Sequence, residues 1–154
     1  MKYLVLIADI DEFNPCKNSL GDLVKKEYKI KHMPAFDFSY NNHEVTVVCF
    51  GIGKVNAAMG AALALTLGEY DGVINTGWSG AVSGVKKGEI IVSDSCVECD
   101  FDLTPIGRLP GQKPGQDEYI YKCESDLANK VKAIDGFTHG KPGTGDFFLT
   151  DKER

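Results

Sequence analysis

The part of this sequence that most limits how the chain can fold is a strand, a glycine turn, a helix and a second strand in direct succession. Residues 44–50 are β-branched and apolar, which predicts a central strand, and they lead straight into Gly51 and Gly53. Residues 54–67 are rich in Ala and Leu, which predicts a helix that is buried on most sides. With a strand expected at residues 72–75, these elements form a β-α-β unit whose strands are parallel.

The second of these strands ends in a turn of small and polar residues. In open α/β sheets, ligands bind at the carboxyl ends of the strands, where hydroxyl groups and bare backbone amides point outward. The turn could also be only a tight reversal, with its glycines at positive φ. Both interpretations are open for this run on its own, which consists of Thr76, Gly77, Trp78, Ser79 and Gly80.

The remaining elements follow from local patterns. Residues 3–8 predict a buried first strand, because the acids that follow exclude a signal peptide or a membrane span. Residues 9–15 predict an acidic loop. Its acids either bind a cation or orient water, or they stand at a helix start, where the helix dipole favours acidic residues. A short edge strand is expected at residues 28–33, ended by Pro34. Later elements are a strand at 89–94, a long Pro/Gly loop at 100–115, a helix at 125–133, a strand at 137–141 and a strand-end loop at 144–149.

Composition narrows the function. A chain of 154 residues that is 43% hydrophobic predicts one domain with one core. The net charge of −5 and the scattered basic residues argue against a nucleic-acid partner. Five cysteines are an odd number, which indicates reduced thiols and a cytoplasmic protein. Cys96 and Cys99 form a single C-x-x-C, and no metal site is expected. Asn56 replaces the third glycine of a dinucleotide-binding motif, so no such cofactor is expected.

Several motifs together resemble the purine nucleoside phosphorylase superfamily. They are the junction Gly51-Ile52-Gly53-Lys54-Val55-Asn56-Ala57-Ala58, the run Asn75-Thr76-Gly77-Trp78-Ser79-Gly80 and the run Lys87-Gly88-Glu89-Ile90-Ile91-Val92-Ser93-Asp94. A further pattern looks specifically like the methylthioadenosine/S-adenosylhomocysteine nucleosidase branch: Asp100, Asp102, Thr104 and Gly107, followed by Gly111, Gln112, Pro114 and Gly115. The resemblance extends over essentially the whole chain and favours the ligand-site interpretation of the 76–80 turn.

The resemblance implies an α/β single domain with a mixed, mainly parallel sheet flanked by helices. It implies hydrolysis of the N-ribosidic bond of an adenine nucleoside, with release of adenine, in methionine salvage, without a cofactor or a metal. Glu12 would activate the attacking water, a role that suits a carboxylate base, and Ser79 would be the second catalytic residue. Phe148 would lie against the adenine and Leu149 would offer its backbone to the purine edge. The other implied substrate-binding residues are Ile52, Thr76, Gly77, Trp78, Leu103, Ile106 and Arg108.

The chain also departs from the pattern of the family. Trp78 stands where a small residue is usual, Asp9 where an apolar residue is usual, and Arg108 where an aromatic residue often closes the pocket for the 5′-substituent. The family continues beyond Arg154 with the run that grips the ribose hydroxyls and the aspartate that protonates the purine. We therefore expect residues 1–154 to be the N-terminal two-thirds of a nucleoside phosphorylase-like domain.

Two function classes stay open: a nucleosidase, or a truncated and catalytically deficient chain that binds or assembles. Phosphorolysis is a further alternative, although Ile52 would crowd a phosphate and no arginine stands at the glycine turns to pair with one. A homodimer is expected, because the loop at 103–115 carries Ile106 and Leu109 in a segment that reaches the neighbouring subunit in similar nucleosidases.

Overall fold

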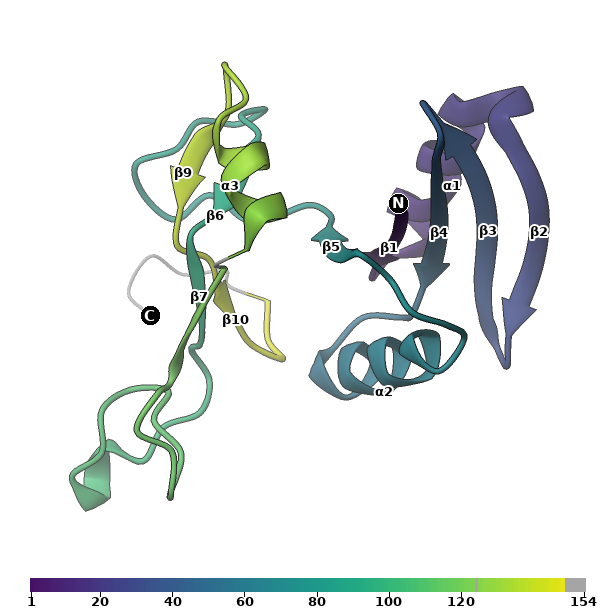
Figure 1. Ribbon diagram of the computed structural model, residues 1–154. Helices are drawn as coiled ribbons and strands as arrows, with labels where there is room; N and C mark the ends of the chain where they lie inside the picture. The colour runs from purple at the N-terminus through teal and green to yellow at the C-terminus, as the bar shows by residue number, and fades with distance from the viewer. Residues whose placement is uncertain (124, 149–154) are drawn as a thin grey trace. The chain divides into compact units, whose positions relative to one another are not determined.

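The computed structural model describes residues 1–123 and 125–148, which belong to two compact units, Met1–Ser79 and Gly80–Arg154. Four strand pairings are parallel and three are antiparallel, and helices accompany them (Figure 1). The predicted α/β class with a mixed, mainly parallel sheet is therefore confirmed. No helix in the described ranges is long and apolar enough to cross a membrane.

A five-stranded sheet with the order β2-β3-β4-β1-β5 forms the first unit. Strand β1 lies parallel to both β4 and β5, whereas β2, β3 and β4 are antiparallel neighbours. Helix α2 connects β4 to β5, so the predicted β-α-β unit is present, with β1 between its two strands. The elements of this unit are β1 (Lys2–Ile7), α1 (Ile10–Leu20), η1 (Gly21–Leu23), β2 (Val24–Ile30), β3 (Met33–Tyr40), β4 (His43–Cys49), α2 (Lys54–Leu65) and β5 (Gly72–Thr76).

The two faces of this sheet carry separate clusters of buried side chains, because successive residues of a strand point to opposite faces. One face packs against Ala64 of α2 through Leu4, Leu6, Ile30, Met33, Ala35, Val48 and Phe50. The other face packs against Phe13 of α1 through Ile7, Phe36, Val47 and Cys49. The sheet is therefore covered by α2 on one face and by α1 on the other, which fixes where the first turn of α1 lies.

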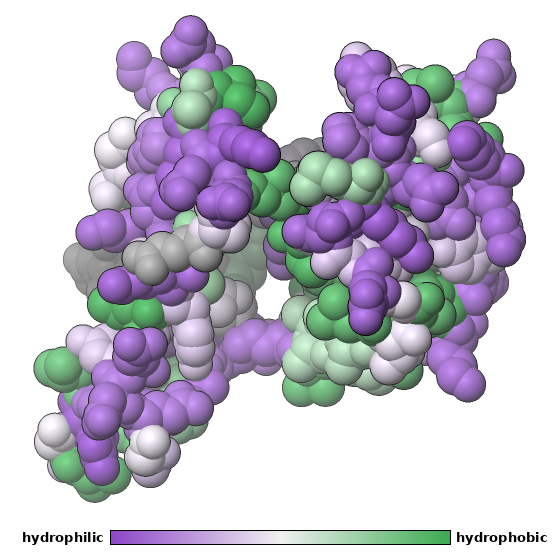
Figure 2. Space-filling view, viewed as in Figure 1, coloured by the Kyte–Doolittle hydropathy of each residue, from purple (hydrophilic) through white to green (hydrophobic). Residues whose placement is uncertain are grey.

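Helix α2 is less buried than its sequence predicts. Within it only Gly60 and Ala64 are buried, whereas Val55, Met59 and Leu65 are exposed. A Cβ atom at Gly60 would collide with the side chain of Phe50, so the helix approaches the sheet along a narrow stripe of small residues. Ala57, Ala61 and Leu63 also pack against the core, partly buried, whereas the exposed apolar residues of α2 contribute to hydrophobic surface (Figure 2).

Before β4, the expected loop is wrong, and the expected edge strand is present as β2, at the sheet edge, with other bounds. Residues 9–15 form the start of α1 instead of a loop, since Asp9 caps the helix and Pro15 is accommodated inside it. The predicted edge strand is part of a hairpin, in which β2 and β3 are joined by a two-residue turn with Lys31 at a φ of 58°. Pro34 does not end the strand. Its missing N–H is tolerated because the pairing of β3 with β4 begins only at Ala35.

In its described residues, the second unit contains short strands, the α-helix α3 and the 3₁₀ helix η2. Strand β7 pairs with β10 and β8, and β6 pairs with β9. The predicted helix at 125–133 is confirmed, with the Ala128 N–H donating to the Ser125 side chain at its start. The strands predicted at 89–94 and 137–141 are present in shorter form, and β8 was not predicted. The elements are β6 (Ile91–Ser93), β7 (Ser95–Glu98), η2 (Thr104–Ile106), β8 (Ile120–Lys122), α3 (Asp126–Lys132), β9 (Thr138–Gly140) and β10 (Gly143–Thr144).

Candidate functional site

The candidate site of the first unit lies where β1 and β5 end. These strands are parallel and their register pairs Ile7 with Thr76, so both chains leave the sheet at the same edge. Strand β1 leads through Asp9 into α1, which carries Glu12 in its first turn. Strand β5 leads directly into the turn that contains Gly77. Parallel strands thus bring an acidic helix start and a glycine turn together.

Glu12 is held by the backbone of this turn. The Trp78 N–H donates a hydrogen bond to Oε1 of Glu12, with a nitrogen to oxygen distance of 2.6 Å. Hydrogen bonds from a backbone amide to a carboxylate are short and are stronger than those between neutral groups. No hydrogen bond joins Oε2 of Glu12 to any residue in the described part of the chain. The bond to Trp78 fixes one oxygen and leaves the other able to accept a proton.

Gly77 allows this close approach. A Cβ atom at this position would lie 2.6 Å from Oε2 and 3.0 Å from Oε1 of Glu12. Neither Gly77 nor Gly80 has a positive φ, so the interpretation of the run as a turn that needs left-handed glycines is not supported. The residue at position 77 is small because the carboxylate occupies the space of a side chain.

The end of β4 lies beside the same edge. The Phe50 N–H donates to the Ile7 carbonyl at 3.0 Å, and Cys49 is buried next to Ala8. Burial raises the pKa of the Cys49 thiol, and the nearby carboxylates of Asp9 and Glu12 raise it further. The Cys49 thiol therefore stays protonated and packs as an apolar group near the acidic start of α1.

The glycine junction between β4 and α2 is ordered by its own side chains. Gly51 and Gly53 have φ values of 96° and 100°, which only glycine adopts without strain. Asn56 donates from Nδ2 to the Ile52 carbonyl at 2.7 Å. The Ile52 side chain itself is 69% exposed. Ile52 is thus presented at the surface on a fixed loop, and its role in binding stays a prediction.

Three further predicted residues of the turn are exposed. Thr76 and Ser79 are exposed, and the Trp78 side chain is 79% exposed although its backbone holds Glu12. No hydrogen bond or ion pair links the Ser79 hydroxyl to another residue within the described ranges. The structure therefore brings together Glu12, Gly77 and Trp78, while the catalytic role of Ser79 stays a prediction.

The other predicted site residues belong to the second unit. In its long loop, the Thr104 N–H donates to Asp102 at 2.8 Å, and this bond holds the pKa of Asp102 below its usual value. Leu103 precedes η2, and Gly107 ends it at a φ of 82°. Ile106 and Arg108 are exposed, and Phe148 is 91% exposed. Leu149 lies outside the described residues. The binding roles of these residues stay predictions.

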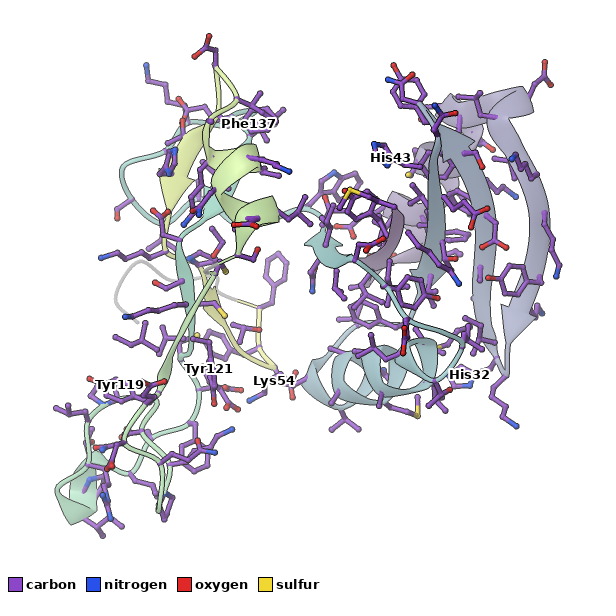
Figure 3. All side chains as sticks on the ribbon, viewed as in Figure 1. His32, His43, Lys54, Tyr119, Tyr121 and Phe137 are labelled. Atoms are coloured by element: carbon purple, nitrogen blue, oxygen red, sulfur yellow. The ribbon has the colours of Figure 1, made fainter. Side chains whose placement is uncertain are left out.

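The histidines and cysteines do not form a metal site in the described ranges, where no group of three or more His, Cys, Asp or Glu side chains could hold an ion. His32 follows β2 and His43 begins β4, at opposite ends of β3 (Figure 3). His139 lies in the second unit, 3.4 Å from the Asp94 carboxylate. Lys132 lies 3.1 Å from that carboxylate, and it lowers the pKa of Asp94 more than His139 does. The Lys132–Asp94 ion pair connects α3 to the segment between β6 and β7.

Sequence reasoning missed the contacts of Asp9. Its side chain accepts a hydrogen bond from the Asp11 N–H at 3.0 Å and caps α1. The signal was available, since an acid followed three residues later by Glu is a pattern of helix starts. Pro15 directed the interpretation toward a loop.

Known proteins are similar to this chain over essentially its whole length. The profile of a family described as "Phosphorylase superfamily" matches residues 2–151. The chain is 34% identical to 5′-methylthioadenosine/S-adenosylhomocysteine nucleosidase of an Exiguobacterium species, over 100% of this chain and 68% of that protein. It is 35% identical to the nucleosidase of the same description from Hydrogenovibrio crunogenus, over 97% of this chain and 66% of that protein.

A solved structure is similar over the same extent. The S-adenosylhomocysteine nucleosidase of Streptococcus pyogenes, in complex with 5-methylthiotubericidin, superposes with a TM-score of 0.80 at 28% identity. The superposition covers 99% of this chain and 66% of that one. The chain thus spans about two thirds of the length of the proteins that it matches.

Proposed function

We propose that this chain, which belongs to the phosphorylase superfamily, carries the water-activating part of a nucleosidase that hydrolyses the N-ribosidic bond of an adenine nucleoside. The substrate class is that of methylthioadenosine and S-adenosylhomocysteine, after the relatives described by that activity. The observation that carries the proposal is the Glu12 carboxylate held by the Trp78 N–H at the carboxyl edge of the sheet.

The chemistry of Glu12 follows from its two oxygens. Oε1 is fixed by the Trp78 N–H, so the carboxylate keeps one orientation. Oε2 accepts a hydrogen bond from a water molecule and takes its proton as the water attacks the anomeric carbon. As the bond to adenine breaks, positive charge develops on the ribose, and a nearby carboxylate also stabilises that charge. General-base help of this kind contributes a factor of about 10² to 10⁴ to the rate.

The substrate-binding part of the proposal rests on the motifs. Ile52 presents an apolar side chain on a fixed loop, which suits the 5′-thioether tail of such nucleosides. Leu103 and Ile106 are assigned to the same tail, Arg108 to its polar end, and Phe148 to the adenine ring. Leu149, to which the resemblance gives a backbone contact with the purine, completes the set.

Adenine release from methylthioadenosine, followed by chromatography, tests the proposal. Glu12→Gln keeps the shape of the side chain but removes the base, so turnover falls by about 10² or more. Asp11→Asn is the matched control: Asp11 is an exposed acid in the same helical turn, and its side chain makes no hydrogen bond to any described residue. Equal turnover in Glu12→Gln and in the unmodified protein would refute the assignment.

The same assay separates hydrolysis from phosphorolysis. Hydrolysis gives free 5-methylthioribose at a rate that does not depend on phosphate, whereas phosphorolysis gives a ribose-1-phosphate. We expect hydrolysis, because Ile52 places an apolar side chain at the glycine junction, where an anion would need donors. Strict dependence on phosphate would favour the alternative.

A homodimer is proposed from exposed apolar residues. Val55, Met59 and Leu65 of α2 are exposed, as are Ile106 and Leu109 of the long loop. Exposed apolar residues on α2, and separately on the long loop, are typical of interfaces. Light scattering should give twice the monomer mass, and Met59→Lys should lower it. A monomer at micromolar concentration would contradict the proposal.

Cytoplasmic location and a place in methionine salvage are proposed with the activity. All five cysteines are free, which suits a reducing compartment. Fractionation of the native source, with the nucleosidase activity followed through each fraction, tests the location. Activity confined to an oxidising compartment would contradict the location.

A further inference from the structure

At the start of α1, the Glu12 side chain has two alternative hydrogen-bond partners. The sequence Asp9-Ile10-Asp11-Glu12 places one acid at the N-cap and another at the third helical position. In a capping box, the acid at the third position turns back and accepts from the N–H of the N-cap residue, which here is Asp9. In this structure, Glu12 instead accepts the Trp78 N–H, and the helix start is capped by Asp9 through the Asp11 N–H at 3.0 Å.

We propose that Asp9 is a positioning residue for Glu12: by occupying the start of α1, it keeps the Glu12 carboxylate on the Trp78 amide. The catalytic meaning of this role rests on the function proposed above, whereas the positioning itself does not. The Asp9 side chain satisfies the Asp11 N–H, and the Glu12 carboxylate in the same helical turn is an alternative acceptor for the amides of that turn. Without the Asp9 side chain, the Asp11 N–H would lose its acceptor and compete with Trp78 for the Glu12 carboxylate.

Charge acts in the same direction as geometry. Asp9 and Glu12 are both carboxylates in one helical turn, so a Glu12 side chain that turned back would approach a like charge. The charge of Asp9 therefore disfavours a Glu12 side chain that turns back, whereas at the Gly77–Trp78 peptide an amide donates and no side chain intervenes.

The backbone of this turn is fixed independently of the Asp9 side chain. The Asp9 carbonyl accepts from the Glu12 and Phe13 N–H groups at 3.2 and 2.9 Å. Phe13 is 3% exposed and packs against Phe36, with 5.2 Å between the ring centroids. Loss of the cap should therefore leave the helix in place and release mainly the side-chain torsions of Glu12.

The chain contains a built-in reporter for this proposal. Trp78 is the only tryptophan, so ¹⁵N-tryptophan labelling gives a single backbone amide resonance. Glu12→Gln defines the position of that resonance when the charged acceptor is lost. Asp9→Ala should shift it toward the Glu12→Gln position. Asp9→Gly serves as a second variant, because glycine is tolerated at helix starts and also lacks the acceptor oxygen.

Two controls isolate the cap. Asp9→Asn retains an acceptor oxygen and should leave the Trp78 resonance near its original position. Asp11→Ala removes a charge from the same turn but keeps the backbone N–H that Asp9 binds, so it should also leave the resonance in place. Circular dichroism shows which variants are folded.

An unshifted Trp78 resonance in folded Asp9→Ala or Asp9→Gly would overturn the proposal, as would an equal shift in Asp9→Asn. In the adenine-release assay, Asp9→Ala should lower kcat by roughly tenfold with little change in KM, and Asp9→Asn should restore it. If the unmodified protein releases no adenine but the resonances behave as described, the proposed function fails while the positioning role stands.

Discussion

Substitution of Gly77 by alanine tests the site at its tightest contact. The new Cβ atom would lie 2.6 Å from Oε2 of Glu12, well inside an ordinary contact, so the carboxylate has to move by roughly 1 Å. Its bond to the Trp78 N–H, now 2.6 Å long, would then be lost. A hydrogen bond to a charged group is worth about 1.5 to 3 kcal/mol, which corresponds to a fall in kcat/KM of roughly 10- to 150-fold.

A double-mutant cycle separates this effect from a general disturbance of the turn. In Glu12→Ala no carboxylate remains to collide with the new methyl group, so Gly77→Ala should cost little further in stability or in binding. The coupling energy comes from thermal unfolding of the four proteins, and kcat/KM for adenine release is compared for the two single variants. Gly77→Ala with unchanged kcat/KM and an unchanged Trp78 amide would refute the reasoning.

Substitutions at three other positions probe the fold and the site. Gly60→Ala should destabilise the protein by about 1 to 3 kcal/mol in chemical denaturation, because its Cβ atom collides with Phe50 in the core. Burial, and then a hydrogen bond to a neighbouring carboxylate, raise the pKa of Tyr28 to about 12 from 10.0. The neutral phenol thus stabilises the fold fully below pH 10, and this contribution disappears as the pH rises toward 12. Between these pH values the unfolding free energy should fall by about 1 kcal/mol more than in Tyr28→Phe, after allowance for solvent screening. Trp78→Pro removes the amide that binds Glu12 and should reduce turnover as Glu12→Gln does, whereas Trp78→Ala should retain it.

The β-α-β unit could be predicted because its signals are local. Strand β4 is a continuous β-branched run, and glycines with positive φ separate it from an Ala-rich helix. The start of α1 was missed because a proline inside a polar segment is usually a sign of a loop. The hairpin of β2 and β3 was missed because Lys31 adopts a left-handed φ without the Asn-Gly or Asp-Gly pair that marks such turns.

The contact at the centre of the site was predictable only in part. That Glu12 and the turn after β5 lie at one sheet edge follows from the order of the strands. That the Trp78 amide binds the carboxylate depends on the register of β1 with β5 and on the direction of α1, which no local pattern encodes. The exposure of α2 has a similar origin, because burial of an apolar helix depends on how many partners the fold supplies.

The contact between Glu12 and the turn also explains which position tolerates change. The donor is a backbone N–H, so the side chain at position 78 does not take part in the bond, and a tryptophan there, 79% exposed, leaves the carboxylate in place. Position 77 is different, because the carboxylate fills the space that any side chain would need. The constraint on this turn therefore falls on Gly77. The unusual tryptophan at position 78 therefore does not weaken the assignment of Glu12 as the base. The Trp78 side chain should affect only the groups that its exposed ring contacts.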